Sequence, residues 1–249
     1  MTLESRRRTA RSPARDLDLP PLFRPIVLRE VGDAFAHART HAGALGAGAL
    51  VFVGRFNLAD FAVVLEPDQP LEKARLAFYV GMVALADALA ALAPPEKPIT
   101  IKWPDAIRID GGLVGGGRLA WPIGTEEAAV PEWLVFGAAI RIASLSDAAP
   151  GLYPLATALA DEGFGEIGAE RLVETFARHL MAAIDRWRDA GFSSLTREYR
   201  TRLEIGSGVT IDADGNAHRR HGDTVTAHSL LSALAEPSWL DPETAEPRL

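Results

Sequence analysis

Short apolar runs alternate along this chain with a few longer stretches of helical periodicity. Apolar runs bounded by glycine, proline or aspartate are typical of β-strands. The predicted strands cover residues 26–30, 49–55, 60–66, 98–103, 106–110, 113–121 and 133–142. The predicted helices cover residues 33–45, 71–93 and 169–190, with a last short helix over 192–202.

The order of these elements indicates the fold class. A strand and a helix are followed by a hairpin, a long helix and several consecutive strands, not by regular alternation of strands and helices. Such an order favours an α+β fold over a doubly wound parallel sheet. We therefore expect a mixed, largely antiparallel sheet flanked by helices.

The texture of the sequence changes beyond Leu203. Residues 209–217 form a hairpin signal around Asp214-Gly215, the type of dipeptide that tight turns between strands prefer. The last residues, 236–249, are rich in proline and acidic side chains, and we expect them to be loosely attached. The predicted organisation is a disordered basic tail (1–19), a main domain (20–203) and a small C-terminal β module with a proline-rich end (204–249).

Composition narrows the class of protein. The chain has 249 residues, 48% of them hydrophobic and 24% charged, enough for one large domain with a small appendage. It has no cysteine, which excludes disulfides, thiolate metal sites and thiol nucleophiles. No apolar run predicts a membrane span and the N-terminus lacks the apolar core of a secretory signal, so we expect a cytoplasmic protein.

Charge is distributed unevenly along the chain. The net charge is −7, yet the first 15 residues carry five arginines against one glutamate. A basic head of this kind is either a solvated tail or an arm that binds nucleic acid or a membrane. It has no interleaved aromatic residues and the rest of the chain is acidic, so we expect neither of these partners.

The most unusual stretch combines a Lys-Trp-Pro-Asp sequence, residues 102–105, with a glycine-rich strand. Five glycines occur among the seven residues 111–117. Such a density lets the main chain pass close to a ligand where a Cβ atom would intrude. The sequence therefore predicts a narrow slot along Gly115, Gly116 and Gly117 with Trp103 packed beside it. A bulge where sheet and helix pack tightly is the alternative.

This combination resembles the core of the biotin/lipoate A/B protein ligase family. There the motif reads Lys-Trp-Pro-Asn-Asp, a strand, Gly-Lys-Lys, a small residue and glycine. The order of helices after residue 156 is also similar, so the likeness covers roughly residues 25–205. It implies the class II biotin/lipoyl synthetase-like fold, a site that binds a small carboxylic acid, and a homodimer formed through the main sheet.

The resemblance also implies a reaction. Family ligases activate biotin or lipoate with ATP and Mg, then pass the acyl group to a lysine of a carrier domain. Charged groups must neutralise phosphate in such a reaction. This chain departs from the family in these charged groups. Leu113 occupies the position of the catalytic lysine, the Asn-Asp pair becomes Asp105-Ala106, and the arginine-rich loop is reduced to Gly54-Arg55.

The resemblance assigns roles to particular residues. The implied catalytic residues are Lys102 and Asp105, although Lys102 faces either the site or solvent. The implied ligand-binding residues are Arg55, Trp103, Gly115, Gly116, Gly117, Arg118 and Arg141. The three arginines either replace the missing cations or are ordinary surface residues.

The histidines near the C-terminus are a weaker signal. His218, His221 and His228 have spacings that metal sites use, but a fourth ligand is missing and arginines flank them. A solvated hairpin is the better interpretation, and we predict no metal site.

Two functional hypotheses remain open. The first is a divergent ligase that attaches biotin or lipoate to a carrier domain. The second is a non-catalytic ligand- or carrier-binding protein on the same fold. Loss of the lysine and the arginine loop together removes several charge-assisted contacts, each worth on the order of 1.5–3 kcal/mol. A cysteine-dependent acyltransferase is excluded.

Overall fold

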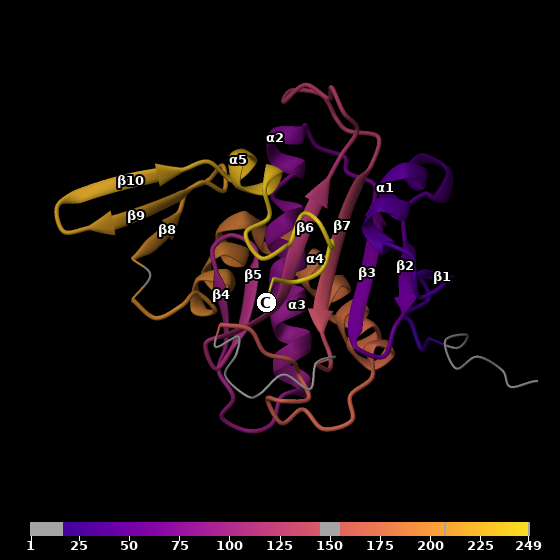
Figure 1. Ribbon diagram of the computed structural model, residues 1–249. Coiled ribbons are helices and arrows are strands. Elements are labelled where there is room, and N and C mark those ends of the chain that lie inside the picture. Colours follow the sequence, from indigo (N-terminus) through magenta and orange to yellow (C-terminus); the bar gives the residue numbers. More distant parts are fainter. Residues whose placement is uncertain (1–16, 145–154, 207, 249) are drawn as a thin grey trace, which may run out of the picture.

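The computed structural model describes residues 17–144, 155–206 and 208–248 (Figure 1). The arginines of the basic tail therefore lie outside the described residues. Residues 17–19 are described and lie against the longest helix, where Arg178 binds the carboxylate of Asp18 at 2.6 Å. Leu17 and Leu19 pack against the core.

One seven-stranded sheet forms the centre of the molecule, in the order β1-β2-β3-β7-β6-β5-β4. Every neighbouring pair is antiparallel except β1 and β2, which are parallel. The strands are β1 (Arg24–Leu28), β2 (Ala49–Gly54), β3 (Leu58–Leu65), β4 (Ile99–Lys102), β5 (Ala106–Ile109), β6 (Gly112–Ala120) and β7 (Leu134–Arg141). The predicted α+β fold with a largely antiparallel sheet is confirmed.

Helices cover one face of this sheet and part of the other (Figure 1). Helices α2 (Leu71–Ala74), α3 (Ala77–Leu92) and α4 (Ala169–Thr201) pack on the rear face, where the largest apolar cluster lies. Helix α1 (Ala34–Leu45) covers β2, β3 and β7 on the front face. The two predicted helices 169–190 and 192–202 form a single kinked element, because Gly191 at φ 73° leaves helical geometry between them.

Within the part of the chain that the structure describes, one segment, Leu71–Leu92, is long and apolar enough to cross a membrane. However, 78% of its most apolar window is buried within the molecule. Burial against the sheet accounts for its apolar composition, as for the core helix of a globular domain.

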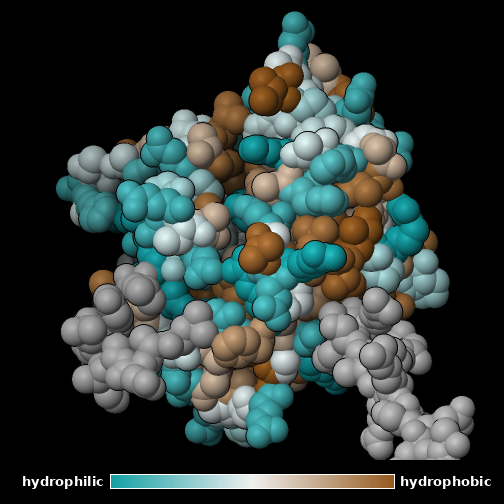
Figure 2. Space-filling model, turned by 45° about the vertical axis from the view of Figure 1, so that its right-hand side comes forward, coloured by the Kyte–Doolittle hydropathy of each residue, from teal (hydrophilic) through white to brown (hydrophobic). Residues whose placement is uncertain are grey.

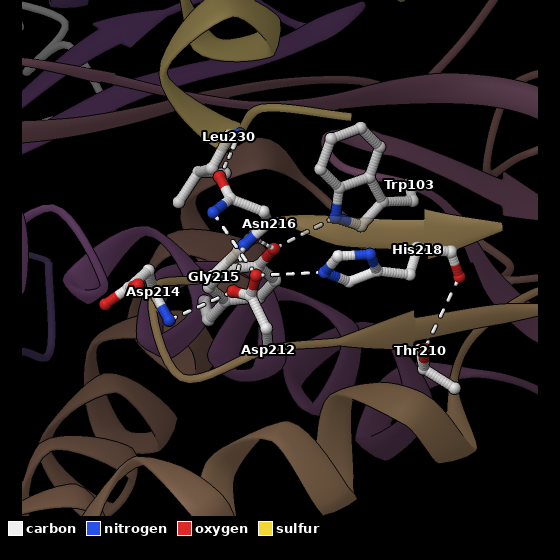
Figure 3. Close-up of polar contacts among 9 residues, drawn as sticks. Trp103, Thr210, Asp212, Asp214, Gly215, Asn216, His218 and Leu230 are labelled. Atoms are coloured by element: carbon white, nitrogen blue, oxygen red, sulfur yellow. Dashed lines mark hydrogen bonds and ion pairs between the residues drawn. The ribbon is translucent and has the colours of Figure 1, made fainter. Parts of the chain in front are cut away.

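The C-terminal module is a second, three-stranded sheet in the order β10-β9-β8. Its strands are β8 (Val209–Ile211), β9 (Ala217–His221) and β10 (Thr224–His228), followed by helix α5 (Leu230–Ala235). The predicted hairpin is confirmed. The Asp212 carboxylate accepts hydrogen bonds from the backbone N–H groups of Asp214 and Asn216, at 3.0 and 2.8 Å, which fixes the turn (Figure 3).

That same turn attaches the module to the main domain (Figure 3). The Tyr79 hydroxyl donates to the carbonyl oxygen of Gly215 at 2.6 Å and accepts from Trp103 Nε1 at 2.9 Å. The Asn216 side-chain oxygen accepts from the backbone N–H of Leu230 at 3.1 Å, which ties the turn to α5. Because Tyr79 is buried on α3, the module is held by the core and not by surface contacts alone.

After α5 the chain turns back across the front of the main sheet. Residues 236–248, called the C-terminal segment from here on, pass over β5 and β6 and appear as the last yellow loop in Figure 1. The expectation of a loosely attached end is wrong, since Trp239 within it is 0% exposed. The face drawn in Figure 2 is a mixture of apolar and hydrophilic residues, with a larger apolar band toward its right side.

Candidate functional site

The glycines of β6 are approached closely from both faces of the sheet. A Cβ atom on Gly116 would lie 2.1 Å from the carbonyl oxygen of Asp105 and 2.5 Å from Cδ1 of Trp239, which lies on the front face. A Cβ atom on Gly117 would lie 2.5 Å from the sulfur of Met82 and 3.0 Å from the ring of Phe136, on the rear face. At Gly116 the Asp105 backbone cannot yield, so glycine is required there, whereas a side chain at position 117 would force Met82 to move. The sequence predicts an open slot here, whereas the structure shows both faces filled.

Trp239 fills the front face. Its indole N–H donates to the carbonyl oxygen of Gly117 at 3.0 Å. The ring belongs to a small apolar cluster that is separate from the two larger ones. The other buried members of this small cluster are Leu58, Ala106, Leu113 and Ala139. An indole supplied by the C-terminal segment therefore occupies the position where the sequence predicts a ligand.

Asp105 binds the residue next to this indole. Its carboxylate accepts from the backbone N–H of Ser238 at 2.8 Å and from the Ser238 hydroxyl at 2.7 Å. The side chain is buried, and burial raises the pKa of Asp105 to about 6 against the opposing effect of the Ser238 hydrogen bonds. The residue that the resemblance implies as catalytic therefore holds the C-terminal segment in this structure.

Two of the three predicted arginines bind the other end of the segment. Arg55, just after β2, forms an ion pair with Glu246 at 2.7 Å and donates to the carbonyl oxygens of Glu30 and Gly32. Arg141, at the end of β7, donates to the carbonyl oxygen of Pro247 at 2.7 Å. The pKa of Arg141 is lowered by burial. These guanidinium groups thus contact a carboxylate and a carbonyl, the oxygen groups that an acid would present.

Arg118 takes no part in holding the segment. It extends from β6 toward α1, where Nη2 donates to Asp33 at 3.1 Å and the guanidinium lies 4.2 Å from the centre of the Phe35 ring. Asp60 on β3 lies in the same polar cluster and accepts from the backbone N–H of Ala34 at 3.1 Å. Burial raises the pKa of Asp60 to about 6. Among the described residues, Asp60 Oδ1 and Arg118 Nε have no hydrogen-bond partner.

Lys102 and Trp103 lie away from the glycines. Lys102 ends β4 and is exposed to solvent, and it reaches Asp105 only through its charge. Trp103 donates to Tyr79 and its ring lies 6.1 Å from that of His228, so it faces the C-terminal module. The prediction that Trp103 packs beside the glycine slot is wrong, and the indole found there is that of Trp239.

No lysine replaces the missing family cation. The chain has three lysines. Lys73 pairs with Asp214 at 2.8 Å, Lys97 pairs with Glu162 at 2.7 Å, and Lys102 is the exposed residue at the end of β4. Leu113, at the position where the family has its catalytic lysine, packs in the cluster around Trp239. The front face is apolar at this point.

The histidine-rich hairpin holds ordinary side-chain contacts. His218 Nε2 lies 3.0 Å from the Asp212 carboxylate (Figure 3). Within residues 17–144, 155–206 and 208–248, no three histidine or acidic side chains are grouped closely enough to hold a metal ion.

Comparison with known proteins shows which family this chain belongs to. The family model for the biotin/lipoate A/B protein ligase family matches residues 19–201. The chain belongs to this family. A biotin–[acetyl-CoA-carboxylase] ligase of Mycobacterium tuberculosis is 30% identical over 141 residues, which cover 56% of this chain and 48% of that protein. The chain thus matches about half the length of this curated relative.

Solved structures of biotin/lipoate ligase-like proteins share the fold. A biotin protein ligase-like protein of unknown function from Silicibacter sp. TM1040 superposes with a TM-score of 0.76 and 29% identity, over 89% of this chain and 100% of that one. Biotin protein ligase from Aquifex aeolicus superposes with a TM-score of 0.66 and 14% identity, over 83% and 95% of the two chains. At that identity the second likeness concerns the fold alone.

Sequence reasoning missed Ser238, Trp239 and Glu246 in this family member. These residues lie in a segment whose prolines and acidic side chains suggest solvent exposure. The one available signal is Trp239 itself, a large aromatic residue in an otherwise polar stretch, because such residues usually bury their surface.

Proposed function

We propose that this protein binds a small carboxylic acid of the biotin or lipoate class on the front face of β6, without activating it. The observation that carries the proposal is the way the C-terminal segment occupies this face. A flat two-ring group with an N–H donor lies on the glycines, and a carboxylate binds Arg55. Biotin offers the same combination, a fused ring system with N–H donors and a carboxylate on a flexible chain.

The absence of activation is supported by the cluster around Leu113. Adenylation requires a cation at the acid carboxylate and the phosphate, where charge develops. Leu113 and its neighbours place an apolar surface there, and all three lysines lie elsewhere. The short connection between β2 and β3 supplies Arg55 alone, in place of an arginine-rich loop.

The second candidate function is ATP-dependent attachment of the acid to a lysine of a carrier domain. It is favoured by Arg55 and Arg141, whose guanidinium groups lie at the front face, and by Arg118, which extends from β6 toward α1. Guanidinium groups bind phosphate well. A magnesium ion accompanying ATP fits this face poorly, because Asp105 is already bonded to Ser238 and no group of three metal ligands forms among the described residues. The carrier would be a biotinyl or lipoyl domain.

Calorimetry and a pyrophosphate-release assay separate the two. Full-length protein is titrated with biotin, with lipoate and with ATP, and is then incubated with acid, ATP and Mg, using the Aquifex aeolicus ligase as positive control. We expect heat of binding with an acid and no release of pyrophosphate. Release that depends on the acid would establish the ligase instead. If no acid binds either wild type or a variant with a weakened C-terminal segment, the proposed function is wrong.

A cytoplasmic location and a homodimer remain proposals that follow from family membership. Cell fractionation and light scattering of the purified chain test them.

A further inference from the structure

The front face of the sheet and the C-terminal segment are matched to each other at both ends of the segment. Asp105 binds Ser238, Gly116 leaves room for the Trp239 ring, and the carbonyl oxygen of Gly117 accepts from its N–H. Arg55 and Arg141 bind Glu246 and Pro247. These residues come from the β2–β3 connection, the β4–β5 connection, β6 and β7, yet all of them contact one short stretch of chain, residues 238–247. A chance surface contact would not engage buried acid, glycines and arginines together.

We infer that this face is a peptide-binding site whose occupant is the C-terminal segment of the same chain, so that the segment and a small acid exclude each other. The part of this inference that concerns an acid rests on the proposed function. The part that concerns the peptide rests only on the contacts just described.

The C-terminal segment has a structure of its own, as a peptide ligand with a defined bound shape requires. The Asp241 backbone N–H donates to the carbonyl oxygen of Glu246 at 2.9 Å, and the Arg248 N–H donates to that of Trp239 at 2.8 Å. The Asp241 carboxylate caps the loop between them by accepting from the N–H of Glu243 at 2.8 Å. A loop that closes on itself loses less conformational entropy when it docks. It presents Trp239 and Glu246 to the sheet at the same time.

One anchor dominates the docking. Trp239 is 0% exposed, whereas the Glu246 side chain is 41% exposed and its ion pair with Arg55 is open to screening by salt. In interfaces of this kind a buried aromatic residue carries most of the binding free energy. Loss of the Trp239 side chain should therefore release the segment, while loss of the Glu246 charge should only loosen it.

Mutual exclusion follows from the close packing at Gly116 and Gly117. The indole already uses the carbonyl oxygen of Gly117 and occupies the space that a Cβ atom on Gly116 would need. A second ring cannot occupy the same space, because interiors are packed at close to crystal density. An acid can enter only when Trp239 leaves, so its apparent affinity is reduced by the fraction of molecules in which the segment is undocked.

The test uses full-length Trp239→Ala protein and a fluorescein-labelled peptide of residues 236–248. We expect the peptide to bind this variant in trans, with Kd measured by fluorescence anisotropy, and not to bind wild type, whose own segment occupies the face. A peptide with alanine in place of Trp239 is expected not to bind. The matched control protein is Trp133→Ala, which truncates an indole packed near α1 and should behave as wild type does.

Calorimetry with biotin and with lipoate on the same proteins tests the regulatory consequence. We expect Trp239→Ala to bind an acid about tenfold or more tightly than wild type and Trp133→Ala do, and the acid to displace the peptide. Peptide binding without acid binding would support the peptide site and overturn the proposed function. Equal acid binding by all proteins, with no peptide binding, would support the function and overturn the inference.

A second measurement covers the case in which Trp239→Ala does not fold. Hydrogen–deuterium exchange is then compared between wild type and Glu246→Gln, which leaves the buried cluster intact. We expect faster exchange of the backbone N–H groups of residues 240–248 in the variant and unchanged exchange in β6. Exchange of the segment as fast as in the free peptide, already in wild type, would show that it is not docked and would overturn the inference.

Discussion

On both faces of β6 a glycine leaves room for a neighbouring side chain, but the two close contacts differ in what they do for the molecule. On the rear face Gly117 makes room for Met82 and Phe136, which belong to the main core and are contributed by α3 and β7. At Gly116 the carbonyl oxygen of Asp105 approaches closest, and on the front face Gly116 also makes room for Trp239, which comes from the C-terminal segment. The rear contact is part of the fold, because nothing can remove it without unfolding the domain. The front contact lies on a surface loop that can leave while the sheet remains.

The largest effect should come from breaking the rear contact. Phe136→Ala leaves a cavity beside Phe176, Phe78 and Gly117, and we expect it to lower the free energy of unfolding by about 3–5 kcal/mol. Urea unfolding followed by circular dichroism measures this loss.

Trp239→Ala provides the matched comparison on the front face. Its cost is limited to the free energy with which the segment docks, so we expect a smaller loss, roughly 1–3 kcal/mol. Equal losses for the two variants, with loss of protection throughout β6, would show that the front contact is as much part of the fold as the rear one.

The glycine-rich strand β6 shows which structural features the sequence predicts and which it does not. The seven strands of the main sheet, the kinked helix, the hairpin at Asp214-Gly215 and the unusual character of Gly115–Gly117 follow from local patterns of period, turn residues and glycine density, whereas β10 and α5 are not predicted. What approaches those glycines does not follow, because a close approach requires only the absence of a side chain and does not identify the neighbour. Trp239 lies 122 positions from its hydrogen-bond acceptor Gly117, a separation that no local pattern encodes.

The predicted site residues illustrate the same limit. Arg55, Asp105 and Arg141 do converge on one face, but on the segment that composition assigns to solvent. Arg118 is directed instead toward α1 by Asp33 and Phe35. Which partner each charge finds depends on tertiary packing, and the sequence supplies only the charges themselves.

A third prediction concerns the polar cluster of Asp33, Asp60 and Arg118 beside α1. Burial raises the pKa of Asp60 to about 6 from an ordinary value near 3.8. The folded state therefore holds this proton more tightly than the unfolded state does. The contribution of Asp60 to stability is fully present below about pH 3.8 and is lost as pH rises through about 6.

Asp60→Asn should remove this contribution to the pH dependence. We expect the difference in unfolding free energy between pH 4 and pH 7 to change by about 2–3 kcal/mol relative to wild type, the equivalent of two pKa units. Urea unfolding at several pH values measures it, with exposed Asp68→Asn as the control. A variant whose stability follows that of wild type at every pH would show that Asp60 is ionised in the fold without cost.

The smallest effect should come from the exposed end of the C-terminal segment. Glu246→Gln removes the charge that pairs with Arg55 and keeps the shape of the side chain. Because the glutamate is 41% exposed, the pair is screened, and we expect a loss below about 1 kcal/mol that shrinks in 1 M salt. Thermal unfolding at low and high salt measures it.

The same variant sharpens the comparison between the two faces. Trp239 anchors the segment through burial, so the segment should stay docked when Glu246 loses its charge. A loss comparable to that of Trp239→Ala would instead make the Arg55 ion pair the principal anchor, and the front face would then select its occupant by charge before shape.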